Sequence, residues 1–189
     1  MYAALLADAR FHDLLLAADR DLAEACRTEG CPCGGARHMA RYGRKPRGRP
    51  CRLGLEHDQR FSFCYAVDGC RSRATPPSLR FLGRRVYVAA VVVLIAILRD
   101  GVSDARLDRL SEVVSVDRRT IGRWRRWWRD TFPATPFWRA ARAGFMPPPD
   151  ETRLPAALIE RFGGRAQDRL VAVLRFVGPV TGGSGMRAF

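Results

Sequence analysis

The sequence predicts a mostly α-helical protein in which a small, cysteine-rich β ribbon precedes a helix-turn-helix. Three observations predict this fold class. Helical periodicity dominates both ends of the chain, five of the six cysteines fall in a stretch rich in glycine and proline, and residues 106–124 carry two apolar stripes separated by a turn. We divide the chain into an N-terminal helical segment (1–29), a ribbon domain with a basic loop (30–80), a helix-turn-helix (81–134), a C-terminal helical segment (135–180) and a tail predicted to be disordered (181–189).

The charge of the chain favours a polyanionic partner. The 189 residues carry a formal net charge of +14, and 47% of them are hydrophobic, which is a globular composition. Residues 31–85 hold thirteen basic and three acidic side chains, whereas residues 1–30 hold three basic and six acidic ones. The positive field therefore centres on the cysteine-rich third of the chain, and nucleic acid or an acidic membrane would suit it.

The apolar stretches give no reason to expect a membrane protein. The longest, residues 86–98, is shorter than the roughly 20 residues needed to span a bilayer, so we interpret it as part of a buried helix. Residues 1–21 lack the basic start and apolar run of a secretory signal. We therefore expect no membrane partner and a reducing, cytoplasmic location, in association with the nucleoid.

Apolar spacing predicts most of the remaining elements. Residues 2–27 fit one or two amphipathic helices, whose role would be packing or self-association into a homodimer. Between the cysteines only short strands are expected, at 38–42 and 60–64, with residues 41–50 forming an extended basic loop. Further helices are predicted at 84–99, 104–113, 117–131, 154–162 and 165–177, with prolines interrupting the chain between residues 133 and 149.

The cysteines predict a zinc site. Cys31 and Cys33 form one pair and Cys64 and Cys70 a second, each next to a glycine-marked turn, so that four thiolates could bind one tetrahedral Zn²⁺. A segment with so few large apolar side chains would gain its missing stability from the metal. The possible substitute ligands are Cys26, Cys51, His38 and His57. Free buried thiols are the competing interpretation.

Residues 106–124 carry the pattern of a helix-turn-helix. Leu107, Leu110 and Val114 form an apolar stripe, and Ser115 occupies the turn. Asp117 is placed to cap the next helix by accepting its free N–H groups. Two helices joined in this way can place the N-terminal end of the second helix in the major groove of DNA.

A helical wheel separates this second helix into an apolar and a basic face. With Ile121 at the centre of the buried face, Trp124, Trp128 and Phe132 lie within about 60° of it. Gly122 leaves room for a close approach on the other side. The predicted DNA contacts are Arg118, Arg119, Thr120, Arg123 and Arg126 on the helix, and Arg44, Lys45, Arg47 and Arg49 in the basic loop, which would bind phosphates.

Residues 30–145 resemble a family of bacterial proteins. The resemblance lies in Arg44-Lys45-Pro46-Arg47-Gly48, in the stretch from Thr75 to Tyr87, and in residues 123–128. The chain is similar to the N-terminal part of bacterial insertion-sequence transposases, in which a zinc ribbon precedes a homeodomain-like helix-turn-helix. This resemblance implies DNA binding tied to mobile elements, both cysteine pairs as zinc ligands, and a transposase as a partner.

The resemblance does not extend to the chemistry of transposition. A strand-transfer nuclease needs three carboxylates around two metal ions, within an α/β domain. Beyond the helix-turn-helix the acids are Asp150, Glu151, Glu160 and Asp168, with no strand pattern around them. We therefore expect a protein that is not an enzyme.

The sequence-based hypothesis is sequence-specific binding of duplex DNA by a zinc-stapled helix-turn-helix protein. It would act as a transcriptional regulator, or as an accessory or remnant of a transposition system. Two alternatives remain: an RNA-binding or ribosome-associated zinc-ribbon protein, which would expose base-stacking aromatics, and a structural zinc protein that binds an acidic protein partner.

Overall fold

The computed structural model of the protein describes residues 2–39, 42–43, 53–65, 67–70, 73–82, 87–88 and 116–181. These residues are mostly helical, with a small three-stranded antiparallel sheet, so this part of the fold-class prediction is confirmed. Much of the predicted basic loop, the predicted helix at 104–113 and nearly all of the tail lie outside the described residues. The pairing of two helices into a helix-turn-helix therefore stays a prediction.

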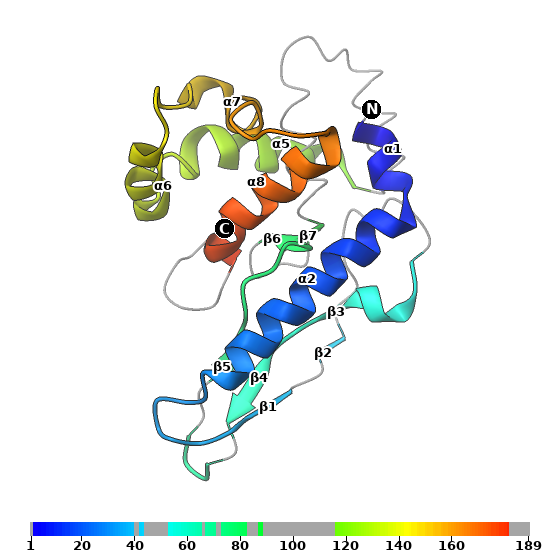
Figure 1. The fold of residues 1–189 in the computed structure, drawn as a ribbon, viewed down its shortest axis with the longest axis vertical. Helices are drawn as coiled ribbons and strands as arrows, with labels where there is room; N and C mark the ends of the chain where they lie inside the picture. Colours follow the sequence, from blue (N-terminus) through cyan, green and yellow to red (C-terminus); the bar gives the residue numbers. More distant parts are fainter. Residues whose placement is uncertain are drawn as a thin grey trace.

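The N-terminal segment forms two helices, α1 (Tyr2–Ala7) and α2 (Ala9–Thr28), which confirms the helices predicted there. Asp8 separates them and caps α2, because its side chain accepts a hydrogen bond from the Arg10 N–H at 3.0 Å. Helix α2 buries one face, which includes Phe11, Leu15 and Ala23, at the spacing expected of an amphipathic helix. It runs along much of the length of the molecule (Figure 1).

The ribbon consists of short strands. Strands β1 (Arg37–Met39), β4 (Phe63–Tyr65) and β5 (Arg73–Ala74) form the antiparallel sheet in the order β1-β4-β5. Strand β2 (Tyr42–Gly43) pairs with β3 (Gln59–Arg60), which follows the short 3₁₀ helix η1 (Leu55–Asp58). The strand predicted at 60–64 is thus divided between two sheets, and β2 lies within the stretch interpreted as a basic loop.

The prediction of a helix at 84–99 is wrong at Tyr87 and Val88, the two residues of this range that the structure describes. Tyr87–Val88 form strand β7, which pairs antiparallel with β6 (Phe81–Leu82). An apolar run with β-branched and aromatic residues suits a buried strand as well as a buried helix, and periodicity alone does not distinguish them. At Tyr87 and Val88 the chain is a strand and not a helix, because it pairs with the apolar strand β6.

The C-terminal half is helical. Helix α5 (Arg118–Arg126) continues into a single π-helical turn, η2 (Trp127–Thr131). The short helices α6 (Pro136–Ala141), η3 (Arg142–Gly144), η4 (Glu151–Arg153) and α7 (Ala156–Ile159) follow, and α8 (Ala166–Thr181) ends the described chain. Helix α6 was not predicted. Pro136 begins it instead of interrupting the chain, because proline at the first helical position lacks only an N–H that would have no helical partner.

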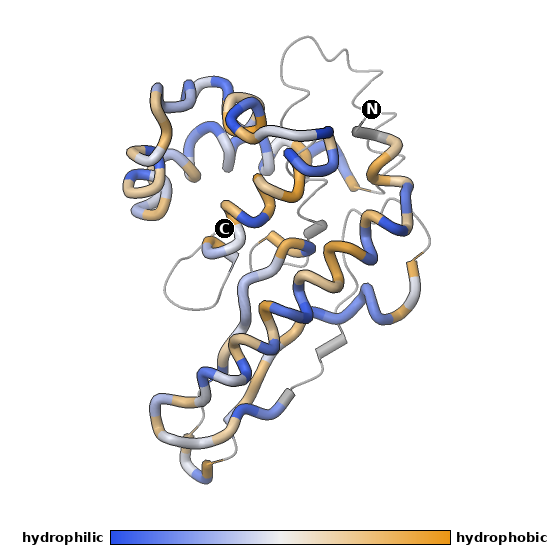
Figure 2. The backbone as a smooth tube through the Cα atoms, viewed as in Figure 1, coloured by the Kyte–Doolittle hydropathy of each residue, from blue (hydrophilic) through white to orange (hydrophobic). Residues whose placement is uncertain are grey.

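One hydrophobic cluster unites the helices. It contains Leu15 from α2, Ile121 from α5, Trp138 from α6, Leu158 from α7 and Leu174 from α8. Helices α5, α6, α7 and α8 gather at one end of the molecule and the ribbon strands lie at the other (Figure 1). Apolar residues recur along α2 and α8, which both contribute to this core (Figure 2). The division into separate domains stays a prediction, although four of the five predicted segments contribute side chains to this core.

Residues 78–82 join the ribbon end to the helical end. The Ser78 N–H donates to Thr181 Oγ1 at 2.8 Å, at the end of α8, and the Leu79 N–H donates to Asp19 Oδ1 on α2 at 2.6 Å. Leu79 and Leu82 extend from the same stretch into the hydrophobic cluster. The segment is therefore bound to both long helices at once.

No helix within the described part of the chain is both long and apolar enough to cross a membrane.

Candidate nucleic-acid interface and metal site

Helix α5 begins where the sequence predicted. Asp117 has extended backbone angles, and its carboxylate accepts hydrogen bonds from the Thr120 N–H at 2.8 Å and from the Thr120 hydroxyl at 3.0 Å. These hydrogen bonds, the backbone one first, and the nearby charge of Arg123 hold the pKa of Asp117 below its ordinary value. The cap is confirmed, and it keeps the carboxylate ionised at the helix N-terminus.

The buried face of the helix is the predicted one. Ile121, Trp124, Trp128 and Phe132 are all at most 2% exposed and belong to the hydrophobic cluster. Trp127 is buried beside them, which the wheel did not predict. A single π-helical turn begins at this residue, where the Phe132 N–H donates to the Trp127 carbonyl, five residues back, at 2.8 Å. The rings of Trp127, Trp128 and Phe132 contact one another in the core.

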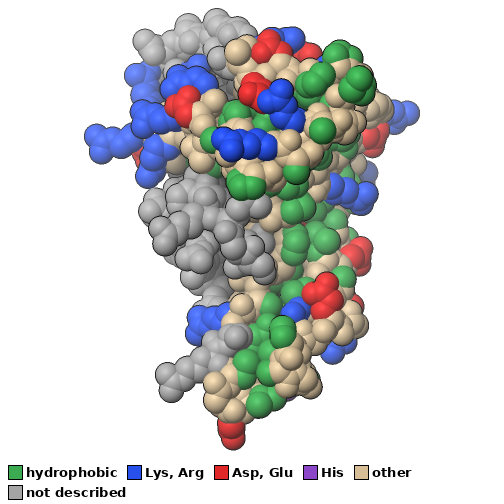
Figure 3. Space-filling view, turned by 90° about the vertical axis from the view of Figure 1, so that its left-hand side faces the viewer, with side chains coloured by type: hydrophobic (Ala, Val, Ile, Leu, Met, Phe, Trp, Pro, Cys, Tyr) green, Lys and Arg blue, Asp and Glu red, His purple; other side chains and the backbone are tan. Residues whose placement is uncertain are grey.

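The opposite face of α5 is basic and exposed. Arg119, Arg123 and Arg126 recur at the four- and three-residue spacing that aligns side chains on one side of a helix, and we call these three residues the arginine face. Among the described residues none of the three forms an ion pair with an acid within 4.0 Å. Arg118 is also exposed. Basic side chains gather at the upper end of the molecule, where the C-terminal helices lie (Figure 3).

Two neighbours of this face differ from it. Thr120 was predicted as a DNA contact, but it is 2% exposed, and its hydroxyl lies within the cap. A direct contact between its side chain and DNA is therefore not available in this conformation. Arg129 lies one turn beyond and donates from Nε and Nη2 to both carboxylate oxygens of Asp130, at 2.7 and 2.9 Å, so its charge is largely compensated.

Gly122 lies in the middle of α5, beside the arginine face. Glycine in a helix interior costs about 0.5–1 kcal/mol relative to alanine because it orders a more flexible backbone. A Cβ atom added at Gly122 would meet no heavy atom within 4 Å, and the residue is exposed. The packing of the described residues therefore gives no reason for glycine at this position.

The structure brings three of the four predicted zinc ligands together. The thiol sulfurs of Cys31, Cys33 and Cys70, which we call the cysteine group, all lie within 4.8 Å of one another. The Sγ–Sγ distance is 2.8 Å between Cys31 and Cys33 and 3.7 Å between Cys31 and Cys70. Residues far apart in sequence thus converge on one point at the end of the ribbon.

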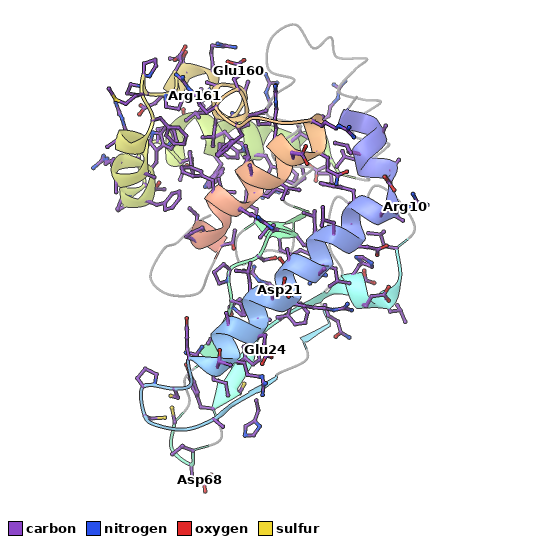
Figure 4. All side chains as sticks on the ribbon, viewed as in Figure 1. Arg10, Asp21, Glu24, Asp68, Glu160 and Arg161 are labelled. Atoms are coloured by element: carbon purple, nitrogen blue, oxygen red, sulfur yellow. The ribbon has the colours of Figure 1, made fainter. Side chains whose placement is uncertain are left out.

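Two tight turns place these cysteines. The Gly34 N–H donates to the Cys31 carbonyl at 2.8 Å, and the Cys70 N–H donates to the Val67 carbonyl at 3.0 Å. Gly34 and Gly69 have φ angles of 81° and 87°, a left-handed conformation that favours glycine. Asp68 lies in the second turn, at the lower tip of the molecule and far from Glu160 and Arg161 (Figure 4). The cysteine group and the C-terminal helices therefore occupy opposite ends.

The donor set fits a zinc ion. Thiolates are the ligands of structural zinc, and a tetrahedral site with Zn–S bonds of about 2.3 Å has sulfurs roughly 3.8 Å apart. The Cys31–Cys70 distance is close to this spacing, whereas Cys33 would have to move outward. Burial, together with hydrogen bonds shared with Cys33 and Cys70, raises the pKa of the Cys31 thiol. A divalent cation would offset this effect by stabilising the thiolate.

The fourth predicted ligand, Cys64, does not belong to the cysteine group. It lies on β4, opposite His38 of β1. Sequence spacing indicated two pairs of thiols, but spacing does not fix which way a strand side chain points.

The substitute ligands also lie outside the group. The Cys26 thiol accepts a hydrogen bond from Arg37 Nη1 at 2.8 Å, and His57 pairs through Nε2 with Asp13 Oδ1 at 3.1 Å. Cys51 falls outside the described residues, as do the loop residues Arg44, Lys45, Arg47 and Arg49.

The chain matches no family model, and searches of curated proteins and of solved structures return no match. The functional conclusion therefore rests on the geometry of the arginine face and of the cysteine group.

Proposed function

We propose that this protein binds duplex DNA, that helix α5 inserts its arginine face into the major groove, and that a zinc ion stabilises the ribbon. The observation that carries the proposal is the exposed row of Arg119, Arg123 and Arg126, without acidic partners among the described residues and with Gly122 beside it. Exposed arginines that form no ion pair within the protein are a typical surface for a polyanion.

The dimensions of this surface suit a groove. The major groove is about 12 Å wide and therefore admits a helix. Arg119 and Arg126 are seven residues apart, so the arginine face extends about 10.5 Å along the helix axis. Arginine can make bidentate hydrogen bonds to guanine edges as well as to phosphates. The absence of a Cβ at Gly122 lets the DNA backbone or a base edge approach the helix closely between these side chains.

The cysteine group would act away from the DNA surface. Cys31, Cys33 and Cys70 would bind the zinc ion as thiolates, and the metal would supply folding free energy to a segment of short strands. The fourth ligand would be Cys51 or Cys64. Because the group lies at the end of the molecule opposite the C-terminal helices, its role is structural (Figure 4).

RNA binding through stacked bases is a weaker alternative. Such binding uses exposed aromatic rings, but all four tryptophans, Trp124, Trp127, Trp128 and Trp138, are buried. An acidic protein partner remains the other alternative. Salt-sensitive binding of nucleic acid would favour the nucleic-acid hypotheses, and its absence would favour the acidic protein partner. Within the proposal, the protein is a non-catalytic regulator or a transposition accessory, with a transposase as a candidate partner.

The test is a set of equilibrium titrations with duplexes selected from a random library and with random duplexes. Arg119→Ala and Arg126→Ala should each weaken binding about tenfold or more. Arg20→Ala is the matched control, because Arg20 is an exposed arginine on α2 and its loss changes the net charge equally. Equal losses in all three variants, or no salt-sensitive duplex binding by the parent protein, would refute the proposal.

A further inference from the structure

We infer that Arg123 is the base-reading residue of the arginine face, and that Thr120 positions it through a chain of hydrogen bonds that ends on Asp117. This inference rests on the proposed DNA binding and makes it more specific. The group that Arg123 would read is the O6/N7 edge of a guanine, which accepts two parallel hydrogen bonds from one guanidinium.

The hydrogen-bond chain has a defined direction. Arg123 Nη2 donates to Thr120 Oγ1 at 2.6 Å, the Thr120 hydroxyl donates to Asp117 Oδ2 at 3.0 Å, and the Thr120 N–H donates to Asp117 Oδ1 at 2.8 Å. A hydroxyl has a single proton, so a Thr120 that donates to Asp117 presents its lone pairs to Arg123. The ionised carboxylate therefore orients the guanidinium through the threonine.

The middle of this hydrogen-bond chain, at Thr120, is protected from solvent. Thr120 is 2% exposed, so water does not compete freely for its hydroxyl, whereas Arg123 itself is exposed. A guanidinium held in this way has given up part of its rotamer freedom before DNA arrives, and it gives up less on binding. It has five N–H donors, of which one is used by Thr120, so enough remain for a bidentate contact.

The other two members of the arginine face are not held in this way. Neither Arg119 nor Arg126 donates a side-chain hydrogen bond to any residue that the structure describes. Mobile cations suit phosphates, which carry no sequence information, whereas base reading requires a fixed orientation. Asp117 also offsets part of the Arg123 charge, which weakens non-specific attraction to phosphates without removing the donors. The geometry therefore assigns different tasks to neighbouring arginines.

The experiment compares three variants on a selected duplex, on random duplexes, and on selected duplexes with single G·C replacements. Thr120→Val removes the hydroxyl and keeps the shape, whereas Thr120→Ser keeps the hydroxyl. Arg123→Lys keeps the charge and removes the bidentate fork. We expect Thr120→Val to lower the ratio of selected to random affinity about fivefold or more, and Thr120→Ser to retain most of it. We expect Arg123→Lys to abolish the preference for one particular guanine.

Each outcome bears on one claim. Wild-type protein that binds no duplex refutes the proposed function itself. Wild-type protein that prefers the selected duplex, together with a Thr120→Val variant that keeps the full ratio, refutes the positioning by Thr120 and leaves DNA binding intact. Circular dichroism melting shows whether Thr120→Val folds. If it does not, Arg123→Lys decides, because an unchanged preference at every G·C position would overturn the assignment of Arg123.

Discussion

Asp19 and Arg80 form a buried ion pair that fastens α2 to residues 78–82. Arg80 Nε lies 2.8 Å from Asp19 Oδ2, and both side chains are at most 6% exposed. The Asp19 carboxylate also accepts hydrogen bonds from the Ser78 hydroxyl and the Leu79 N–H, and Arg80 Nη2 donates to the Gln59 carbonyl at 2.8 Å. Burial lowers the pKa of Arg80, while the charge of Asp19 opposes that shift.

Removing the carboxylate of this pair should be strongly destabilising. Asp19→Asn leaves a buried guanidinium without a counter-charge, which costs about 3–5 kcal/mol. Asp21→Asn is the control, because Asp21 points away from the protein on the same helix (Figure 4). Urea unfolding followed by circular dichroism measures both variants. Equal stability of the two variants would show that the pair contributes nothing.

Replacing Gly122 should separate stability from binding. Gly122→Ala should stabilise the protein by about 0.5–1 kcal/mol, since the added methyl group meets no heavy atom. It should weaken duplex binding if DNA approaches the helix there. Gly144→Ala in η3 is the matched control, because Gly144 is also exposed and its Cβ would also meet nothing. Thermal melting and DNA titration test both variants, and unchanged DNA affinity in Gly122→Ala would exclude a close approach at that position.

The purified protein should contain about one zinc ion per chain. Cys33→Ser and Cys70→Ser should each lose most of the metal, because their sulfurs belong to the cysteine group. Cys26→Ser should retain it, since the Cys26 thiol is hydrogen-bonded to Arg37 instead. Elemental analysis measures the metal content, and the same assay on Cys51→Ser and Cys64→Ser identifies the fourth ligand. Metal-free parent protein would contradict the site.

The stability of the protein should decrease on acidification because of His12. Its imidazole is buried, with Nε2 at 2.9 Å from the Leu6 carbonyl, and burial lowers its pKa from 6.5. The unfolded chain therefore takes up a proton first, so this contribution is complete above pH 6.5 and is lost as the pH falls through the lowered pKa. His12→Gln should reduce the loss of stability between pH 7.5 and about 5.5. His38→Gln, at an exposed histidine, is the control in urea unfolding.

The basic loop should contribute affinity without sequence preference. Neutralising Arg44, Lys45 and Arg47 together should weaken binding to selected and random duplexes alike. The slope of log affinity against log salt should decrease by about one unit for each phosphate that the loop no longer neutralises. Titrations at several salt concentrations measure this slope. A weakening confined to the selected duplex would instead assign base contacts to the loop.

Local patterns predicted helix α5 well. Asp117 caps α5 and Ile121 lies at the centre of its buried face, because capping and amphipathic periodicity depend on residues within one or two turns. The burial of Trp127 was not predictable in this way. It depends on packing within a hydrophobic cluster whose members come from elements far apart in the sequence, and a helical wheel contains no such information.

The candidate metal site was predicted only in part. The turns at Gly34 and Gly69 are visible in the sequence, and they bring Cys31, Cys33 and Cys70 together. The position of Cys64 depends on the register of β4 against β1, which pairs it with His38 and is set by contacts far along the chain. The hydrogen bond from Arg123 to Thr120 had a visible signal, a threonine three residues before an arginine, but its significance needed the burial of Thr120.

The contact between Ser78 and Thr181 also constrains the order of folding during synthesis. The two residues are 103 positions apart, and Arg60 donates to the Thr181 carbonyl across 121 positions. A ribosome releases the chain from its N-terminus, so α2 and the ribbon emerge long before the helix that receives residues 78–82. Contacts of such long sequence separation form slowly, because a large loop must close first. The hydrophobic cluster therefore lacks the side chains of α8 until that helix has been made, and that interval is when a chaperone would be needed most.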